Sequence, residues 1–461
     1  MNSLSEKCAI FGIYGKHLDV SRLTYFGLYA LQHRGQESSG ISVANGKNIR
    51  THKATGLVAQ VYNEKILEKM QGHIAIGHNR YATSGGTFFQ HTQPVATVKN
   101  QLVLAHNGNL PETKKLKAFL KSKKITTRGM NDSELMHKAI EYYLLKGLSL
   151  KEAVKAAFPL FTGAYCLLIM TNKELVGIRD EYGIRPFSLG RLNDGYVLSS
   201  ETCALDTMNA TYIRDIKPGE MVVINKDGLT SYQLAKPKQK LDIFEFVYFS
   251  RPDSILLGKR VYNVRENLGR ELAKEFTHKA DAIIPVPESA IPAAIGFSKQ
   301  SGIPFEFGLI KNRYIGRTFI MPDQKLRESG VRMKLNPIKE VIQGKTIIVI
   351  DDSIVRGTTS KQIVSMLRTA GAKKVYVLSS CPPVKYPDFY GIATPLQKDL
   401  IGSRMKVSQI QKHIGADKLY YLSYKGLIKA TELAEDIFCT SCFTGVYPID
   451  IGENAKTIKH V

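Results

Sequence analysis

The chain has 461 residues, of which 43% are hydrophobic and 23% charged, and 64 Lys+Arg against 41 Asp+Glu give a formal net charge of +23. This length favours two domains, and the composition is that of a globular protein with a sizeable core. No apolar run approaches the length of a membrane span, and the N-terminal sequence lacks the apolar stretch of a secretory signal. Six cysteines without a regular framework are typical of a reducing cytoplasm, where we expect the protein.

The basic residues are scattered, in short runs such as 121–124 and 236–240, and no aromatic residues interleave them into a nucleic-acid-binding stripe. Two interpretations of the charge stay open. One is a positive field that attracts polyphosphate substrates, and the other is a lysine-rich solvated surface, which the scatter favours. We expect neither a nucleic-acid nor a membrane partner.

The predicted elements change character along the chain. The first half reads as short strands with two helices, one beginning near Pro111 and one after Asp132. Residues 236–240 are polar, contain proline and mark a linker. Beyond them, strand–loop–helix units predict a parallel sheet covered by helices. The strands of both halves are expected at 74–76, 101–105, 164–170, 196–199, 282–284, 346–350 and 374–378.

Cys8 precedes the apolar stretch Ala-Ile-Phe-Gly-Ile, a strand that would hold it rigidly. A cysteine at the first position of a chain has its own α-amine, with an unperturbed pKa of roughly 7.7–8.0, as an internal base. Such chemistry requires removal of residues 1–7. A cysteine on a strand is more often a core residue, so Cys8 alone decides little.

Three later segments, 78–85, 105–110 and 131–134, together with Cys8 resemble the N-terminal-nucleophile glutamine amidotransferases over about residues 8–230. The resemblance implies that Arg80 grips the glutamine α-carboxylate, for which a guanidinium is well suited. It implies that Asp132 holds the α-ammonium, and that the Asn107 side chain and the Gly108 N–H form an oxyanion hole. Taken singly, Asp132 or Ser133 is also a candidate helix N-cap, Asn107-Gly108 a hairpin turn, and Arg80 a surface ion pair.

The stretch 347–360 joins a buried strand to a helix through two carboxylates and a glycine-containing loop. Backbone N–H groups and hydroxyls at such a helix start bind phosphate, and paired acids accept ribose hydroxyls or hold Mg²⁺ through water. The stretch resembles the phosphoribosyl pyrophosphate (PRPP) motif of type I phosphoribosyltransferases. Two further loops match that family, with Ser289 as a metal-associated serine and 311–318 as a loop that closes over PRPP. The resemblance implies PRPP contacts from Asp351, Asp352, Ser353, Gly357, Thr358, Thr359, Ser360, Lys311 and Arg313, and a Mg²⁺ site at Ser289, Asp351 and Asp352.

A glutaminase domain followed by a phosphoribosyltransferase domain resembles the amidophosphoribosyltransferase family nearly end to end. The resemblance implies an αββα N-terminal-nucleophile domain at 8–235 after a propeptide at 1–7, and a type I phosphoribosyltransferase domain with a parallel sheet at 236–461. It implies that ammonia released at Cys8 passes through an internal channel and attacks the ribose C1 of PRPP while pyrophosphate leaves. That reaction is the first step of purine biosynthesis, with Mg²⁺ as cofactor, purine nucleotides as inhibitors and a homotetramer or dimer as the assembly.

The sequence departs from relatives that carry a [4Fe–4S] cluster on four cysteines. Cys439 and Cys442 match two ligand positions, whereas Asp242 and Asp388 occupy the other two. Clusters normally need four thiolates and carboxylate is a harder ligand, so we expect no cluster. A mixed Asp₂Cys₂ cluster or a Zn²⁺ site is the alternative, and Cys381 is a poorly placed substitute ligand. We expect Cys166 and Cys203 in the core.

The sequence disfavours two rival functions. A glutaminase joined to a sugar isomerase is disfavoured by the PRPP motif at 347–360. A PRPP- or nucleotide-sensing regulator that binds nucleic acid through its charge is disfavoured by the intact set Cys8, Arg80, Asn107, Gly108 and Asp132, which a regulator does not need.

Overall fold

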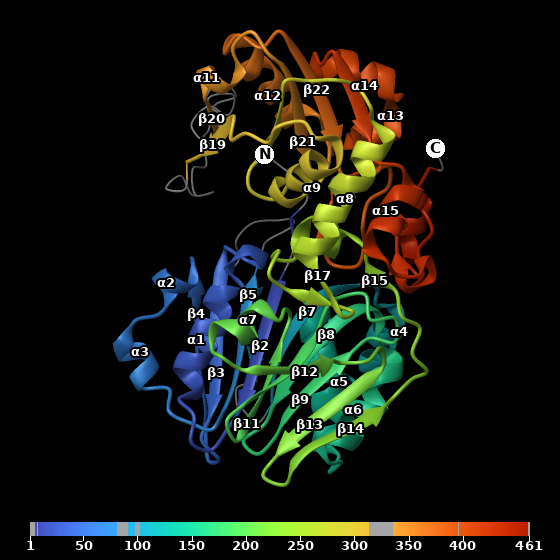
Figure 1. The fold of residues 1–461 in the computed structure, drawn as a ribbon. Helices are drawn as coiled ribbons and strands as arrows, with labels where there is room; N and C mark the ends of the chain where they lie inside the picture. Colours follow the sequence, from blue (N-terminus) through green and yellow to red (C-terminus); the bar gives the residue numbers. More distant parts are fainter. Residues whose placement is uncertain are drawn as a thin grey trace.

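The computed structural model describes residues 5–6, 8–80, 91–96, 102–312, 335–394 and 396–459. Two bodies follow one another along the chain (Figure 1). The lower body, blue to green, stacks two antiparallel sheets between helices, and the upper body, yellow to red, wraps helices around a parallel sheet. The predicted change from short strands with few helices to a parallel sheet covered by helices is therefore present in the fold.

The first sheet of the lower body has seven strands in the order β12-β10-β11-β2-β5-β3-β4, all antiparallel. Helix α1 packs on its outer face, with the short helices α2, α3 and α7 beside it. The strands are β2 (Cys8–Tyr14), β3 (Ser38–Ala44), β4 (Ile49–Thr55), β5 (Ile74–Arg80), β10 (Ser188–Leu192), β11 (Gly195–Ser199) and β12 (Thr211–Asp215). The helices are α1 (Val20–Ala30), α2 (Val58–Val61), α3 (Glu64–Glu68) and α7 (Cys203–Thr207).

The second sheet has six antiparallel strands in the order β14-β13-β9-β8-β7-β6, with three helices on its outer face. The strands are β6 (Val95–Ala96), β7 (Val103–Glu112), β8 (Thr162–Met170), β9 (Leu175–Arg179), β13 (Glu220–Asn225) and β14 (Gly228–Gln233). The helices are α4 (Lys114–Ser122), α5 (Asp132–Leu145) and α6 (Leu150–Ala157).

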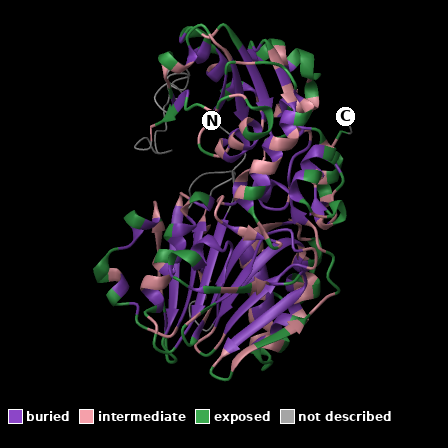
Figure 2. Cartoon of the chain, in the orientation of Figure 1, coloured by how far each residue is buried: buried purple, intermediate pink, exposed green. Residues whose placement is uncertain are grey.

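Strand β2 shows why the inner strands of the two sheets are apolar. Successive side chains on a strand point to opposite faces. Ala9 and Phe11 pack toward α1, whereas Ile10 packs into the core between the two sheets with Cys166 and Leu168 of β8. Because both faces are covered, the strand lacks polar alternation, and its side chains are buried throughout (Figure 2).

The parallel sheet of the upper body has the order β18-β21-β22-β24. One face packs against α8, α9 and α15, and the other against α12, α13 and α14. Helices α8 and α9 approach closely through Gly269 and Gly296, where an added Cβ would lie 1.8 and 1.9 Å from a carbonyl oxygen of the other helix. The elements are α8 (Val261–Glu275), β18 (Ala282–Pro285), α9 (Ile291–Ser301), β21 (Thr346–Asp351), α12 (Thr358–Thr369), β22 (Lys374–Ser379), α13 (Ile401–Arg404), α14 (Val407–Ile414), β24 (Lys418–Tyr421) and α15 (Tyr424–Thr431).

Short strand pairs complete the fold, and two of them join segments far apart in sequence. Strand β15 (Leu241–Asp242) runs parallel to β25 (Phe438–Cys439), and β1 (Ser5–Glu6) pairs with β23 (Ile392–Ala393). The remaining elements are the hairpins β16 (Ile255–Leu256) with β17 (Lys259–Arg260) and β19 (Leu309–Lys311) with β20 (Leu335–Pro337), and the helices α11 (Lys339–Ile342) and α16 (Ser441–Thr444).

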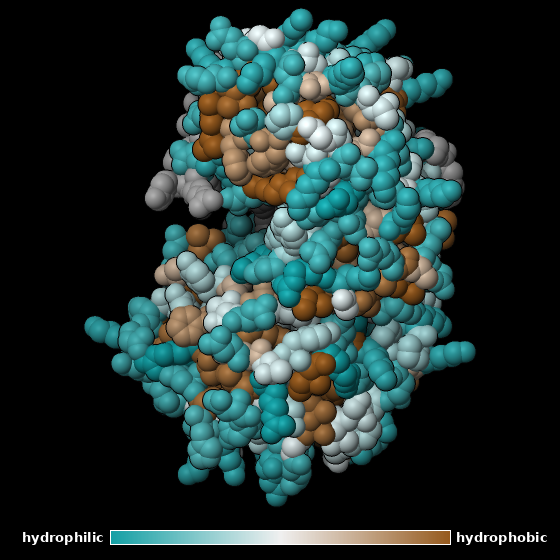
Figure 3. All heavy atoms as spheres, viewed as in Figure 1, coloured by the Kyte–Doolittle hydropathy of each residue, from teal (hydrophilic) through white to brown (hydrophobic). Residues whose placement is uncertain are grey.

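Hydrophilic side chains cover most of the face seen in Figure 3, with apolar groups in separate patches. Large exposed apolar side chains such as Tyr29, Leu145 and Val446 lie far apart in the sequence. In the portion of the chain that the structure describes, no helix combines the length and apolar character needed to cross a membrane.

Candidate active site

Cys8 is the first residue of β2 and lies directly opposite Arg80, the last residue of β5. Arg80 is in turn opposite Ser38 at the start of β3. The Cys8 side chain is buried, at 8% exposed, whereas Arg80 is partly exposed at the sheet end. The register therefore places a thiol and a guanidinium on neighbouring strands at one end of the first sheet.

Asn107 and Gly108 lie in the middle of β7, paired with Cys166 and Tyr165 of β8. The hairpin turn considered for Asn107-Gly108 is therefore wrong, because the strand continues through both residues. Gly108 has φ +148°, and an added Cβ would lie 2.0 Å from the carbonyl oxygen of Ala164. Only glycine fits this bulge-like backbone.

A serine ties Asn107 to the strand of Cys8. The Asn107 Nδ2 donates to Ser200 Oγ at 3.2 Å, and the same oxygen accepts from the backbone N–H of Ile10 at 3.0 Å. Asn107 itself is 1% exposed. The sequence alone predicted no role for Ser200.

Asp132 is the first residue of α5, and its carboxylate faces β7. Its Oδ2 accepts from the Leu110 N–H at 3.2 Å and lies 3.7 Å from His106 Nδ1. The helix N-cap is Asn131, whose side chain accepts from the Glu134 N–H. The N-cap interpretation of Asp132 or Ser133 is therefore wrong, and the Asp132 carboxylate is directed at the strand that carries Asn107 and Gly108.

Two histidines link the two sheets below this site. His78 of β5 contacts the carbonyl oxygen of His106 through Nε2 at 3.0 Å, and His106 Nδ1 contacts Ser133 Oγ at 3.0 Å. Burial lowers the pKa of His78 to about 3, so this imidazole is neutral at physiological pH. The neutral ring forms a hydrogen bond that joins β5 of the first sheet to β7 of the second.

The second group of predicted residues lies at the carboxyl end of β21. Asp351 ends this strand, and its Oδ1 accepts from the Asp352 N–H at 2.9 Å. Ser353 Oγ donates to Asp352 Oδ1 at 2.6 Å, and Ser289 Oγ, from the loop after β18, donates to Asp352 Oδ2. Burial and the mutual repulsion of the pair raise the pKa of Asp351, and burial raises that of Asp352.

The start of α12 follows this pair. Gly357 is the N-cap with φ +77°, Thr358 and Thr359 are exposed, and Ser360 is buried. Backbone N–H groups of such a first turn are available to an anion. Lys311, at the end of β19, lies 3.5 Å from Glu288 Oε2. Arg313 lies outside the described residues, as do most of the loop 311–318 and the segment 81–85.

The residues at the proposed magnesium site fit that ion. Mg²⁺ prefers carboxylate and hydroxyl oxygens and retains water. Asp351, Asp352 and Ser289 supply such oxygens at one strand end, and a cation would relieve the repulsion between the two buried carboxylates. The positive charge of Arg265 opposes the effect of burial and lowers the pKa of Asp352.

The two bodies meet at a buried ion-pair network that sequence reasoning missed. Arg34 of the first body pairs with Glu245 of the second at 2.8 Å, and Arg185 pairs with the same carboxylate at 2.9 Å. Arg34 also contacts Glu201, whose other oxygen accepts from Ser254 Oγ at 2.7 Å. Burial alone would raise the pKa of Glu201, but the His33 and Arg34 charges hold this pKa well below its ordinary value.

The four positions of the cluster ligands lie near one another but do not form a metal site. Asp242 Oδ1 accepts from the Phe244 N–H, and Asp388 Oδ1 accepts from two backbone N–H groups, so these atoms already have donors. Asp242 Oδ2 has no hydrogen-bond partner but lies 3.7 Å from the Arg185 guanidinium, which disfavours a cation there. Across the described ranges, no grouping of three or more His, Cys, Asp or Glu side chains is arranged to hold a metal ion.

Burial raises the thiol pKa values of Cys439 and Cys442, with Asp242 adding to the effect. Because aspartate occupies two of the four positions, these residues do not supply the four thiolates that such a cluster normally needs. Cys166, Cys203 and Cys381 are also buried.

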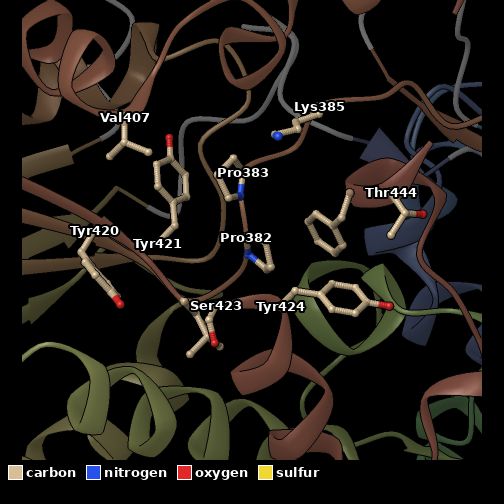
Figure 4. Close-up of a pocket in the computed structure, with 11 residues that line it drawn as sticks. Pro382, Pro383, Lys385, Val407, Tyr420, Tyr421, Ser423, Tyr424 and Thr444 are labelled. Carbon is tan, nitrogen blue, oxygen red and sulfur yellow. The ribbon is translucent and has the colours of Figure 1, made fainter. Parts of the chain in front are cut away.

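A cavity of about 540 Å³ opens beside the edge strand β24, lined by tyrosines and prolines such as Tyr421, Tyr424 and Pro383 (Figure 4). None of the residues predicted for either site lines it. The cavity is therefore separate from the groups that carry the predicted chemistry.

Comparison with known proteins decides the family. A family profile for the glutamine amidotransferase domain matches residues 78–207, and one for the phosphoribosyl transferase domain matches 254–386. Amidophosphoribosyltransferase of Synechococcus elongatus is 49% identical over 98% of this chain and 94% of its own length. That of Bacillus subtilis is 44% identical over 100% and 98%. The chain belongs to the amidophosphoribosyltransferase family.

Solved structures agree with this family. A structure described as the allosteric regulatory enzyme of purine biosynthesis has a TM-score of 0.91 and 44% identity, covering 97% of both chains. Glutamine PRPP amidotransferase from B. subtilis, complexed with ADP and GMP, has a TM-score of 0.90 and 44% identity over 97% of this chain and 98% of that chain. The predicted family, the glutaminase-then-phosphoribosyltransferase fold and the transferase class are confirmed.

Proposed function

We propose that the chain converts glutamine, PRPP and water into 5-phosphoribosylamine, glutamate and pyrophosphate. The observation that carries the proposal is the pairing of Cys8 with Arg80 at one sheet end in a chain that also carries the acidic pair at the end of β21. The family has both domains, which disfavours the sugar-isomerase and regulator alternatives. We place the reaction in the cytoplasm, in the purine pathway.

The glutaminase half-reaction uses the free amine of Cys8 as base, after hydrolysis of the Lys7–Cys8 bond removes residues 1–7. The Cys8 sulfur attacks the glutamine amide carbon while Arg80 and Asp132 hold the α-carboxylate and α-ammonium. Asn107 Nδ2 and the Gly108 N–H stabilise the oxyanion. Ammonia then leaves with the proton, and water hydrolyses the thioester to glutamate.

In the second half-reaction the ammonia passes internally to PRPP, which lies against the end of β21 and the first turn of α12. Asp351 and Asp352 orient the ribose. The hydroxyls of Ser353, Thr358, Thr359 and Ser360, with the backbone of the loop at Gly357, bind its 5′-phosphate. Lys311 and Arg313 close over the pyrophosphate, which leaves as nitrogen bonds to C1. Ser289, Asp351 and Asp352 would hold Mg²⁺, which would neutralise charge on the leaving pyrophosphate.

We assign residues 1–7 to a propeptide, 8–235 to the glutaminase domain and 236–461 to the phosphoribosyltransferase domain. Purine nucleotides are proposed as inhibitors, because a relative has been solved with ADP and GMP. The assembly is proposed to be a homotetramer or dimer.

The test measures glutamate and pyrophosphate release with glutamine, PRPP and Mg²⁺, omitting each in turn, and records the intact mass. Near-equal release of both products, with glutamate release rising when PRPP is added, supports the proposal. A mass lacking seven residues places Cys8 at the N-terminus. Turnover of neither substrate by protein of processed mass would contradict the reaction.

A further inference from the structure

A segment of the second domain, residues 388–394, contacts β7 of the first domain, the strand that carries Asn107 and Gly108. Asn109 Nδ2 donates to the Phe389 carbonyl oxygen at 2.7 Å. Gly391 has φ +120°, and an added Cβ would lie 3.2 Å from the Gly108 Cα and 3.4 Å from its carbonyl carbon. The two glycine backbones therefore face one another so closely that even a methyl group at position 391 would press on Gly108, and the position of Gly391 limits that of Gly108.

The Asp388 carboxylate organises this segment. Its Oδ1 accepts from the N–H groups of Tyr390 at 2.8 Å and Ile392 at 3.0 Å, which closes the loop around Gly391. Its own N–H donates to Thr394 Oγ1 at 2.7 Å. Asp388 is 7% exposed, so these bonds are shielded from water and gain strength in the low local dielectric.

The same segment also holds the residues before Cys8. In the pairing of β1 with β23, Ser5 is opposite Ala393 and Glu6 is opposite Ile392. Ile392 is thus both a donor to Asp388 and the strand partner of Glu6. Only Lys7 separates this pairing from Cys8.

The opposite end of the segment is anchored as well. The Tyr390 hydroxyl donates to the Ile449 carbonyl oxygen at 2.6 Å and accepts from the Ile449 N–H at 3.0 Å. Tyr390 is fully buried in a cluster with Ala164, the residue whose carbonyl oxygen lies against Gly108. The segment is therefore held rigidly on both sides of Gly391.

We propose that Asp388 is a positioning residue of the glutaminase site. Its carboxylate fixes residues 389–392, so that Gly391 supports Gly108 of the oxyanion hole and β23 holds residues 5–6 in register before Cys8. At this position a carboxylate accepts backbone hydrogen bonds where a metal cluster does not fit. The inference rests on the proposed function, since it assigns Gly108 to the oxyanion hole.

The test compares Asp388→Ala, Asp388→Asn and the control Asp281→Ala, an exposed aspartate that accepts the Thr346 N–H at 2.7 Å in the same domain. Glutamate release with glutamine is measured beside pyrophosphate release with free ammonia, which bypasses the glutaminase. For Asp388→Ala we expect a kcat for glutamate release, expressed per processed chain, at least tenfold lower, with the glutamine KM and ammonia-dependent turnover within about twofold of wild type. Its intact mass should retain residues 1–7 in a larger fraction of chains.

Asp388→Asn keeps an oxygen that accepts both N–H groups, and we expect it to restore glutamate release to within about threefold of wild type. Gly391→Ala is a second route to the same selective loss, because its methyl group displaces Gly108 while Asp388 stays intact. Asp281→Ala should change neither activity.

Equal losses of both activities in Asp388→Ala and Gly391→Ala would overturn the proposal, because a general structural defect affects both sites. Unchanged glutamate release in both variants, or an Asp388→Asn variant as impaired as Asp388→Ala, would overturn it as well. A wild-type protein that uses ammonia but never glutamine would instead contradict the proposed glutaminase function, so the two failures are distinguishable.

Discussion

Cys8 and Arg80 lie directly opposite one another on the antiparallel strands β2 and β5, at the end of the first sheet where β2 begins and β5 ends. This register places the two residues side by side on neighbouring strands without any loop between them. A substrate carboxylate bound at Arg80 would thus be held relative to the nucleophile by two rigid strands, which favours accurate positioning.

Arg80→Lys tests the carboxylate contact. Lysine keeps the charge but loses the planar pair of donors, so we expect the glutamine KM to rise about 10- to 100-fold, equivalent to about 1.5–3 kcal/mol of charged hydrogen bonding. Ammonia-dependent pyrophosphate release should not change. Steady-state kinetics with both nitrogen sources measure this, and an unchanged glutamine KM would contradict the assigned role.

Asn107→Ala tests the oxyanion hole. Removing one donor from such a site costs about 10²–10³ in kcat, and we expect a loss of that size in glutamate release with little change in the glutamine KM. Ser200→Ala removes the oxygen that orients the Asn107 amide and also accepts the Ile10 N–H, and it should lose about three- to tenfold. Equal effects of the two variants would argue that Asn107 acts only through the structure.

Glu245→Ala tests the buried network between the domains. The change leaves Arg34 and Arg185 buried without this carboxylate, so we expect the free energy of unfolding to fall by about 3–5 kcal/mol. The control is Glu432→Ala, which breaks the largely exposed pair with Lys259 and should leave the urea midpoint nearly unchanged. Similar shifts in the two urea transitions would refute the role of burial.

Asp180 predicts a pH dependence of stability. Burial raises its pKa from 3.8 to about 6, so the native state binds more protons than the unfolded state between these values. This contribution is complete below about pH 4 and is lost as the pH rises through 6. The free energy of unfolding should therefore rise by about 1 kcal/mol between pH 7 and pH 5 in the wild type relative to Asp180→Asn. Parallel pH profiles of the two proteins would show that Asp180 has an ordinary pKa.

Metal content tests whether the chain lacks a cluster because aspartate replaces cysteine at two of the four ligand positions, Asp242, Asp388, Cys439 and Cys442. Protein purified without oxygen should contain less than about one iron and one acid-labile sulfide per chain, because a cluster needs four thiolates. Iron and sulfide assays beside a zinc determination measure this. About four irons per chain, with matching sulfide, would show that the two aspartates do not prevent cluster binding.

Much of the fold was predictable because its signals are local. The apolar strand after Cys8, the helix after Asp132 and the strand ending in Asp351 each show their period and their boundaries over a few residues. The motifs also gave the family and the order of the domains. The alternative of a hairpin turn at Asn107-Gly108 was wrong. This dipeptide is common in turns, and sequence alone does not reveal that β7 continues through it.

The amino-acid sequence by itself determined which groups the protein has for its chemistry: a cysteine, an arginine and an acid pair in a recognisable order. Only the tertiary structure decided which distant groups meet. Arg34 reaches Glu245 across 211 residues, and Asn109 reaches Phe389 across 280. Such contacts depend on how two separately patterned domains pack together, and the energy of a buried ion pair or glycine contact exists only after that packing has excluded water.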